Sequence, residues 1–234
     1  MLFRQLFDAK SCTYTYLLAS NYGREALFID PVLEQVALYT RLLQEYQLQL
    51  AITLDTHTHA DHITASGWLH QHYRSRITMG KHTQAQGVHQ IVQEGDVIEL
   101  DGLSLKVIHT PGHTKDSYSF YLSDRIFTGD TLLIRSTGRT DFQEGDAYQQ
   151  YDSLFNKLLA LPDETLVYPA HNYDGITVST IREEKQWNPR LQVSSANEYA
   201  TMMKRLNLAK PHLMEIAVPA NLRCGLEGHS ALIR

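Results

Sequence analysis

Cysteine is scarce in this chain of 234 residues, which contains only Cys12 and Cys224. Two cysteines so far apart define no disulfide framework, and neither has metal-ligand spacing to another cysteine. The sequence therefore excludes a disulfide-stapled scaffold and a thiolate metal site. Two free thiols in a reducing compartment are expected.

An excess of positive charge is also missing, since the formal net charge is -5. A broad basic surface for nucleic acid or anionic lipid is therefore not expected. No apolar run approaches the roughly 20 residues that span a bilayer. The start, MLFRQLFDAKSC, lacks the apolar stretch of a secretory signal and the Arg/Ser content of a transit peptide. We expect a soluble cytoplasmic protein with no nucleic-acid or membrane partner.

Histidine, by contrast, is abundant and unevenly distributed, with twelve residues in the chain. Most histidines in proteins are surface or packing residues, and we assign that ordinary role to His70, His72, His82, His89, His109, His212 and His229. Five others lie in short motifs with aspartate or glycine and need a separate explanation: His57, His59, His62, His113 and His171.

The order of the expected elements is typical of an α/β protein. Strand patterns cover residues 13–20, 25–30, 50–56, 76–80, 96–100, 103–110, 117–122, 125–129 and 165–171, and Asp101-Gly102 is a strong hairpin turn. Helical patterns follow Pro31, cover residues 60–73 with Asp61 near the first turn, include Tyr148, Tyr151, Phe155 and Leu158, and recur near 177–187 and 196–207.

Strands followed by a helix thus occur twice, with no linker or repeat between them. This order predicts two sheets with helices packed outside, a four-layer α/β arrangement. We expect one domain over residues 1–234, with a C-terminal helical segment at about 177–207.

The motif THTHADH (56–62) follows the apolar strand 50–56 directly. His57 and His59 are two residues apart, so they project to the same side of an extended segment. Asp61 and His62 come where the chain turns toward the next helix. Four potential ligands can therefore converge at one strand end.

Three later motifs have the same position at strand ends. HTPGHT places His113 after a Pro-Gly turn, FTGDT places Asp130 after a strand, and YPAH ends on His171. Imidazole and carboxylate ligands without a thiolate suit iron, zinc or manganese. The pattern predicts a metal centre assembled from strand ends and the loops after them.

THTHADH, TPGHT, FTGD and YPAH resemble the metal motifs of the metallo-β-lactamase superfamily, and the resemblance covers nearly the whole chain. It implies the αββα sandwich of the metallo-β-lactamase fold, with the metal at one edge of the two sheets. Fold alone does not give function, and two enzyme classes of this superfamily remain open on these ligands.

The first resembles glyoxalase II, a binuclear zinc hydroxyacylglutathione hydrolase. In that reading His57, His59 and His113 hold one metal ion, Asp61, His62 and His171 hold the other, and Asp130 bridges them. The two ions would generate and orient a hydroxide that cleaves a glutathione thiolester.

The second resembles persulfide dioxygenase, an iron enzyme of sulfide oxidation. The resemblance implies one Fe(II) per chain on a facial triad of His57, His113 and Asp130, which leaves open positions for substrate and oxygen. Around that triad, His59, Asp61, His62 and His171 become outer groups that bond the ligands or metal-bound water. The ligands alone do not distinguish iron from zinc.

Flanking segments favour the dioxygenase. QLFDAKSCTYTYLLA, DTLLIRSTGRTDFQEGD, EEKQWNPRL and AVPANLRCG resemble stretches of that family. Only 63 residues follow His171 (234 − 171). Glyoxalase II resembles a catalytic domain followed by a longer helical substrate domain, so this length also favours the dioxygenase. Relatives in that family often have Gly-Cys where this chain has Ser136-Thr137. Any role of that cysteine in the family therefore cannot be assigned to this chain.

The resemblance implies glutathione persulfide and O2 as substrates, sulfite and glutathione as products, and leaves a homodimer open. It also assigns substrate contacts to Arg139, whose guanidinium fork suits a carboxylate, and to Tyr173. The alternative for Arg139 is an ion pair with Asp141 or Glu144. A non-enzymatic metal sensor is a third reading, but every ligand position is filled. The tail 226–234 gives no prediction.

Overall fold

The computed structural model describes residues 1–211 and 213–226 and divides into two compact units. Unit 1 comprises 1–92, 99–104 and the C-terminal segment from 210, and unit 2 comprises 93–98 and 105–209. His212 and His229, and residues 227–234 of the tail, lie outside the described residues. The prediction of one domain stays a prediction.

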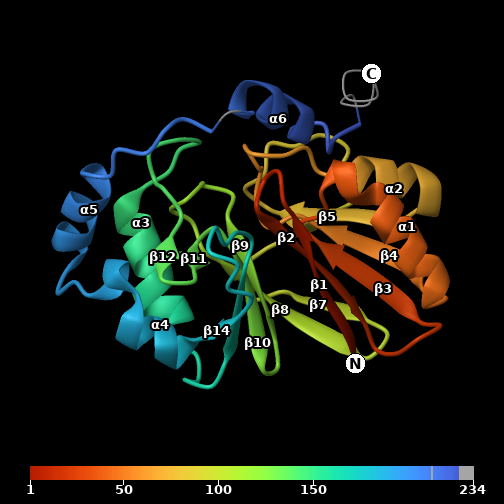
Figure 1. Ribbon diagram of the computed structural model, residues 1–234, viewed down its shortest axis with the longest axis horizontal. Coiled ribbons are helices and arrows are strands. Elements are labelled where there is room, and N and C mark those ends of the chain that lie inside the picture. Colours follow the sequence, from red (N-terminus) through yellow and green to blue (C-terminus); the bar gives the residue numbers. More distant parts are fainter. Residues whose placement is uncertain (212, 227–234) are drawn as a thin grey trace. The chain divides into compact units, whose positions relative to one another are not determined.

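Unit 1 contains a sheet of order β1-β2-β3-β4-β5-β6 (Figure 1). Its strands are β1 (Leu2–Asp8), β2 (Thr13–Ala19), β3 (Glu25–Ile29), β4 (Gln49–Leu54), β5 (Arg76–Gly80) and β6 (Gln90–Val92). β1 to β3 pair antiparallel, whereas β3 to β6 pair parallel. The carboxyl ends of β3 and β4 therefore meet at the same edge, where polar side chains from both can converge.

Helices pack against this sheet through a buried core. η1 (Leu33–Gln35) leads into α1 (Val36–Glu45), whose Tyr39, Leu42 and Leu43 face the core, and α2 (Ser66–Tyr73) adds Leu69. α6 (Met214–Asn221) belongs to the same unit and packs Ala217 on Leu33 and Ile63. The core fixes the segments on either side of the THTHADH motif.

Unit 2 carries most of a second sheet, of order β14-β13-β10-β9-β8-β7. Its strands are β7 (Val97–Leu100), β8 (Leu103–His109), β9 (Tyr118–Leu122), β10 (Arg125–Gly129), β13 (Leu166–Pro169) and β14 (Ser179–Thr180). β9 is antiparallel to both β8 and β10, and β10 is parallel to β13. β8, β10 and β13 therefore run in the same direction and end at one edge.

The other regular elements of unit 2 are a short hairpin and several helices. The hairpin pairs β11 (Leu132–Leu133) with β12 (Ser136–Thr137). The helices are α3 (Ala147–Asp152), the π-helical η2 (Ser153–Leu158), α4 (Ile181–Trp187), η3 (Pro189–Leu191) and α5 (Ala196–Lys204). Leu154, Leu158 and Tyr199 from these helices pack on Ile126 and Val167 of the sheet.

Most predicted elements are confirmed, and Asp101 and Gly102 have the positive φ angles of the expected turn. The predicted helix over 60–73 is wrong at its start, because α2 begins only at Ser66. The predicted helix around Tyr151 is confirmed, but its second half is π-helical, with Leu159 N donating to Leu154 O. β1, β6, β14, the β11–β12 hairpin and α6 were not predicted.

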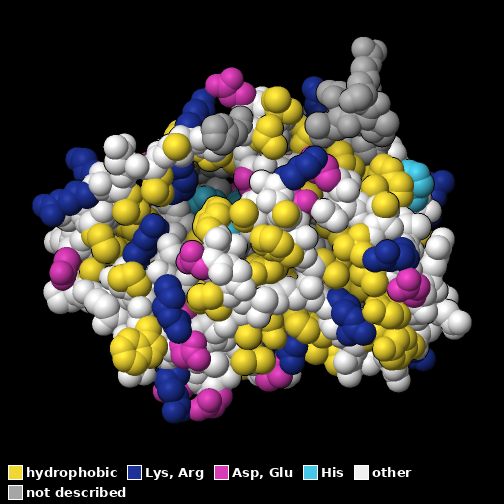
Figure 2. Space-filling view, in the orientation of Figure 1, with side chains coloured by type: hydrophobic (Ala, Val, Ile, Leu, Met, Phe, Trp, Pro, Cys, Tyr) yellow, Lys and Arg dark blue, Asp and Glu magenta, His cyan; other side chains and the backbone are white. Residues whose placement is uncertain are grey.

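No helix in residues 1–211 and 213–226 is long and apolar enough to cross a membrane. On the face that Figure 2 presents, Lys and Arg side chains are interspersed with Asp and Glu rather than gathered in one basic patch. This mixture agrees with the low positive charge of the sequence.

Candidate metal centre

The ligand loop, which we define as residues 55–64 of unit 1, follows β4 directly. His57, His59 and His62 are buried, each with at most 2% exposure. The His59 ring lies 4.2 Å from that of His57 and 4.4 Å from that of His62, measured between centroids. The three imidazoles predicted from THTHADH are thus brought together.

Asp30, at the end of β3, holds this loop from the neighbouring strand. Its Oδ1 lies 3.1 Å from His59 Nε2 and accepts from Thr56 N at 2.7 Å, while Oδ2 accepts from Thr56 Oγ1. Thr56 Oγ1 in turn lies 3.0 Å from His57 Nδ1. A carboxylate that bonds a histidine nitrogen fixes the ring orientation and leaves the other nitrogen for a metal.

Asp61 and His62 are held together with Thr13 of β2. Asp61 Oδ2 lies 3.0 Å from His62 Nδ1, and Thr13 Oγ1 donates to Asp61 Oδ2 at 3.2 Å. One ligand atom each from His59, Asp61 and His62 lie within 4.8 Å of one another. This part of the motif can therefore hold a cation or bond to groups around one.

The ligand loop is not helical because another segment holds its backbone. The buried Asn221 of α6 donates through Nδ2 to His59 O at 2.9 Å and to His62 O at 2.8 Å. Its Oδ1 accepts from Thr64 N at 2.9 Å. A helix over 60–65 would pair these backbone groups within itself, but here Asn221 bonds them instead. This explains why α2 begins only at Ser66.

Asp55 opens the ligand loop and is fully buried beside Asp30. Burial, followed by the charge of Asp30, raises the pKa of Asp55 to about 7. Its two oxygens accept from Thr64 Oγ1 at 2.8 Å and Ser66 Oγ at 2.7 Å, which stabilises the ionised form in part. Asp55 therefore joins the strand end to the start of α2.

Unit 2 brings His113, Asp130 and His171 together, as the sequence predicts. They follow β8, β10 and β13, the three strands that end at one edge. His113 Nε2 lies 3.4 Å from Asp130 Oδ2, and His171 Nε2 lies 3.7 Å from Asp130 Oδ1. Nitrogen and oxygen donors at these separations, with no thiolate, fit iron, manganese or zinc.

The strap, which we define as residues 137–139, fixes His113 and Asp130 by its backbone. His113 Nδ1 donates to Arg139 O at 2.8 Å, which directs Nε2 toward Asp130. Gly138 N donates to Asp130 O at 2.8 Å. A Cβ on Gly138 would lie 2.1 Å from Asp130 O and 2.9 Å from the His113 ring, so only glycine fits.

The Arg139 side chain makes the ion pair that the sequence left open. It forms a two-pronged pair with Asp141, at 2.7 and 2.8 Å, and donates to Ala209 O at 2.6 Å. The hydrogen bond to Asp141 raises the pKa of Arg139, and nearby Tyr173 adds to the effect. Tyr173 is 74% exposed, which excludes an ordinary core role, and its ring stacks parallel to that of His171.

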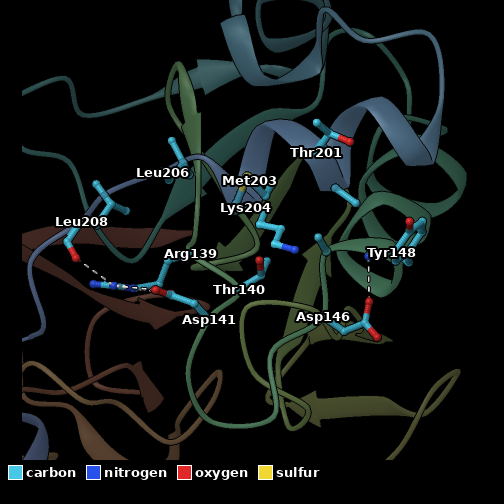
Figure 3. Close-up of a pocket in the computed structure, with 12 residues that line it drawn as sticks. Arg139, Thr140, Asp141, Asp146, Tyr148, Thr201, Met203, Lys204, Leu206 and Leu208 are labelled. Carbon is cyan, nitrogen blue, oxygen red and sulfur yellow. Dashed lines mark hydrogen bonds and ion pairs between the residues drawn. The ribbon is translucent and has the colours of Figure 1, made fainter.

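Arg139 and Asp141 also line a cavity of about 640 Å³ within unit 2 (Figure 3). Lys204 of α5 and Thr140 line the same cavity (Figure 3). The lining also includes the carboxylates of Asp141 and Asp146. The two cations suit a carboxylate group of a ligand.

Sequence reasoning missed the side chains that orient the ligands. Asp30 ends the predicted strand 25–30, just before Pro31, and this position was a signal available in the sequence. Gly138 has no positive φ, and Asn221 is 162 positions from His59. The histidines given ordinary roles have ordinary contacts where described: His70, His72 and His109 bond the carbonyls of Ser75, Trp68 and Lys115.

Comparison with known proteins now identifies the class. The family model of the metallo-beta-lactamase superfamily matches residues 13–171. A crystal structure of ETHE1 from Myxococcus xanthus has a TM-score of 0.94 and 50% identity, and the match covers 96% of this chain and 100% of that chain. The chain belongs to the metallo-β-lactamase superfamily, and the predicted metallo-β-lactamase fold is confirmed.

Two further relatives indicate the family within this superfamily. Persulfide dioxygenase ETHE1 of Mus musculus is 45% identical over 229 residues, which cover 97% of this chain and 90% of the relative. The Homo sapiens protein of the same name is 43% identical over 233 residues, with 99% and 91% covered. Both are named as mitochondrial proteins. Within the superfamily, the chain belongs to the persulfide dioxygenase family.

Membership confirms the predicted enzyme class and disfavours the glyoxalase II-like alternative and the metal sensor. The protein is an oxidoreductase with a metal-binding fold, His and Asp ligand groups and a small-molecule substrate.

Proposed function

We propose that the chain oxidises the sulfane sulfur of glutathione persulfide with O2, on one Fe(II) held by His57, His113 and Asp130. Sulfite and glutathione are the products, and a water molecule supplies the third oxygen atom of sulfite and releases glutathione. The observation that carries the proposal is the His113–Asp130 pair, whose ligand atoms lie 3.4 Å apart at the strand edge. His57 of unit 1 supplies the second imidazole of the triad.

The contacts of the remaining motif residues support outer roles. His59 is engaged by Asp30, and Asp61 and His62 bond each other and Thr13. His171 lies beside Asp130 and stacks on Tyr173. In a mononuclear site, these groups orient the ligands and accept or donate hydrogen bonds around the metal.

When bound, Fe(II) supplies the redox chemistry that transfers oxygen to sulfur. The chain supplies ligand geometry and substrate orientation. His113 keeps its proton on Nδ1 through the bond to Arg139 O, so Nε2 remains available as a ligand. No nucleophilic serine or cysteine is required, which agrees with the two cysteines having no ligand spacing.

Glutathione carries two carboxylates, and Arg139 is the proposed contact for one of them. Its guanidinium already holds the two oxygens of Asp141 in the arrangement that a substrate carboxylate would take. Lys204, on the same cavity, is a second cation for that carboxylate. Tyr173, exposed beside His171, is the proposed contact near the reacting sulfur.

The direct test is His113→Ala in purified protein. The substitution should lower bound iron and abolish O2 uptake with glutathione persulfide. His109→Ala is the matched control, since His109 precedes the same turn but bonds Lys115 O outside the ligand group. Full oxygen uptake by an iron-free His113→Ala protein would refute the assignment.

A substrate comparison separates the two enzyme classes on this fold. The wild-type protein should consume O2 with glutathione persulfide and should not hydrolyse a glutathione thiolester. The reverse result would restore the binuclear zinc hydrolase. The homodimer and the cytoplasmic location stay predictions, the first testable by light scattering and the second by fractionation of cells.

A further inference from the structure

We infer that Thr137, Tyr199 and Gln150 form a hydroxyl chain that positions the strap, and through it the metal ligands His113 and Asp130. The inference rests on the proposed function for the role of those two ligands. It assigns a positioning task to Thr137, a residue to which the sequence assigns no role.

The hydroxyl chain is buried and fully connected. Thr137 is 2% exposed, and Tyr199 and Gln150 are 0% exposed. Thr137 Oγ1 lies 3.0 Å from the Tyr199 hydroxyl, which donates to Gln150 Oε1 at 2.7 Å. Gln150 Nε2 then donates to Gly138 O at 3.1 Å, which returns the chain to the strap.

The direction of the bonds follows from the donors available. Tyr199 gives its only proton to Gln150 Oε1, so Thr137 must donate to the Tyr199 oxygen. Burial raises the pKa of Tyr199 well above its ordinary value, which keeps that proton in place. Arg190 donates to both Thr137 O and Thr137 Oγ1, so the hydroxyl of Thr137 acts as acceptor and donor at once.

The strap transmits this arrangement to the ligands. Gly138 is bonded on its carbonyl by Gln150 and on its N–H by Asp130 O, and the next carbonyl, of Arg139, holds His113 Nδ1. Because Gly138 sits too close to Asp130 and His113 for a Cβ, small strap movements would reach both ligands. A lost bond in the hydroxyl chain should therefore loosen the metal site.

The experiment compares isosteric and hydroxyl-retaining variants. Thr137→Val removes the hydroxyl at constant shape, Tyr199→Phe removes the next one, and Thr137→Ser keeps the Thr137 donor. Tyr151→Phe is the control, because the Tyr151 ring lies 6.0 Å from that of Tyr199 outside the hydroxyl chain. Fe(II) and Co(II) affinities would be measured by chelator competition, together with the Co(II) absorption spectrum, kcat and KM.

Thr137→Val and Tyr199→Phe should weaken metal binding by about 10- to 100-fold, the range typical of groups that orient ligands. They should lower kcat with little change in KM, and alter the Co(II) spectrum. Thr137→Ser and Tyr151→Phe should resemble the wild type. If Thr137→Val does not fold, Tyr199→Phe decides the question alone.

Wild-type metal affinity and kcat in both Thr137→Val and Tyr199→Phe would overturn the inference while leaving the proposed function intact. A wild-type protein that binds metal but takes up no oxygen with glutathione persulfide would overturn the proposed function instead. The metal affinities of the variants would still decide the role of the hydroxyl chain.

Discussion

In unit 1 the candidate ligands are held by side chains, whereas in unit 2 they are held mainly by backbone. Asn221 and Asp30 reach the ligand loop from distant segments and bond its carbonyls, N–H groups and imidazoles. His113 and Asp130 instead contact the strap, where Gly138 N and Arg139 O make the bonds.

The difference decides which substitutions each region tolerates. A side-chain clamp fails when one polar group is removed, because its buried partners lose their hydrogen bonds. A backbone strap bonds the ligands through main-chain atoms, so the loss of a side chain acts on it only indirectly, and it fails most directly when atoms are added at the point of close approach. The most direct way to break each region therefore differs: removal of a polar group in unit 1, and addition of atoms in unit 2.

The largest effect on metal binding is expected from Gly138→Ala, which adds a methyl group to the strap. The new Cβ would lie 2.1 Å from Asp130 O, so the strap must move away from both ligands. Overpacking of this kind costs about 1–3 kcal/mol or more, and iron should be lost. Thermal unfolding and metal content would measure both effects.

Gly95→Ala serves as the control for that variant, since nothing lies within 4 Å of its added Cβ. Gly95 has φ 87°, so alanine there costs about 1–2 kcal/mol of backbone strain without touching a ligand. Equal iron contents in the two alanine variants would contradict the role of the strap.

Asn221→Ala is the corresponding break in unit 1. It leaves the carbonyls of His59 and His62 and the N–H of Thr64 without their bonds to Asn221. We expect a loss on the order of 3 kcal/mol, or roughly 6–12 °C in Tm, together with weaker metal retention. Urea and thermal unfolding would measure the stability.

Cys224→Ala tests whether the weaker metal retention expected of Asn221→Ala is due to Asn221 itself rather than to a general disturbance of its segment. Cys224 is buried in the same segment, but its thiol bonds Gln86 O rather than the ligand loop. The Cys224→Ala variant should retain metal as the wild-type protein does. A Cys224→Ala protein that loses as much metal as Asn221→Ala would show that the segment, not the asparagine, matters.

The stability of unit 1 should also depend on pH, because its buried residue Asp55 has a raised pKa. Asp55 titrates near pH 7 in the folded chain and near its ordinary value of 3.8 when unfolded. As pH rises between these values, the unfolded chain releases the proton first, so this contribution to stability is complete below about pH 4 and is lost through pH 7.

Asp55→Asn should remove that dependence in metal-free protein, and it should unfold at higher urea concentration than the wild type at pH 8. The raised pKa bounds the effect at about 4 kcal/mol. Unfolding midpoints at pH 5 and pH 8 would measure it. Parallel pH profiles for the two proteins would contradict the assignment.

The smallest change in stability is expected from Arg139→Ala, which removes a side chain but no strap bond. Its effect should be a KM for glutathione persulfide raised about tenfold with kcat nearly unchanged, because a substrate contact is lost. Arg125→Ala is the control, since Arg125 forms an equivalent two-pronged pair with Asp124. An unchanged KM in Arg139→Ala would end this assignment.

The ligand motifs were predictable because each is local: a short β-forming run, then histidine or aspartate at its end. The parts that orient them were not. Asn221 pairs with carbonyls about 160 residues away, and it lies in α6, where Pro219 obscures the helical pattern. Position 138 must be glycine because its backbone lies against Asp130 O and the His113 ring. The spacing of residues in the sequence does not reveal such a contact.

The role of Thr137 also could not be predicted from the sequence. The sequence gives Thr137 no role, and only its buried bond to Tyr199, 62 positions away, provides one. Likewise, Asp61 was expected in the first turn of a helix, but tertiary bonds from Asn221 keep its segment in a loop.

The most direct test of the account is the metal content of protein freshly isolated without added metal or chelator, measured by elemental analysis together with the number of ions per chain. One iron per chain, lost in His113→Ala, is the predicted result. Two zinc ions per chain in native protein, with Asp130 shared between them, would contradict it.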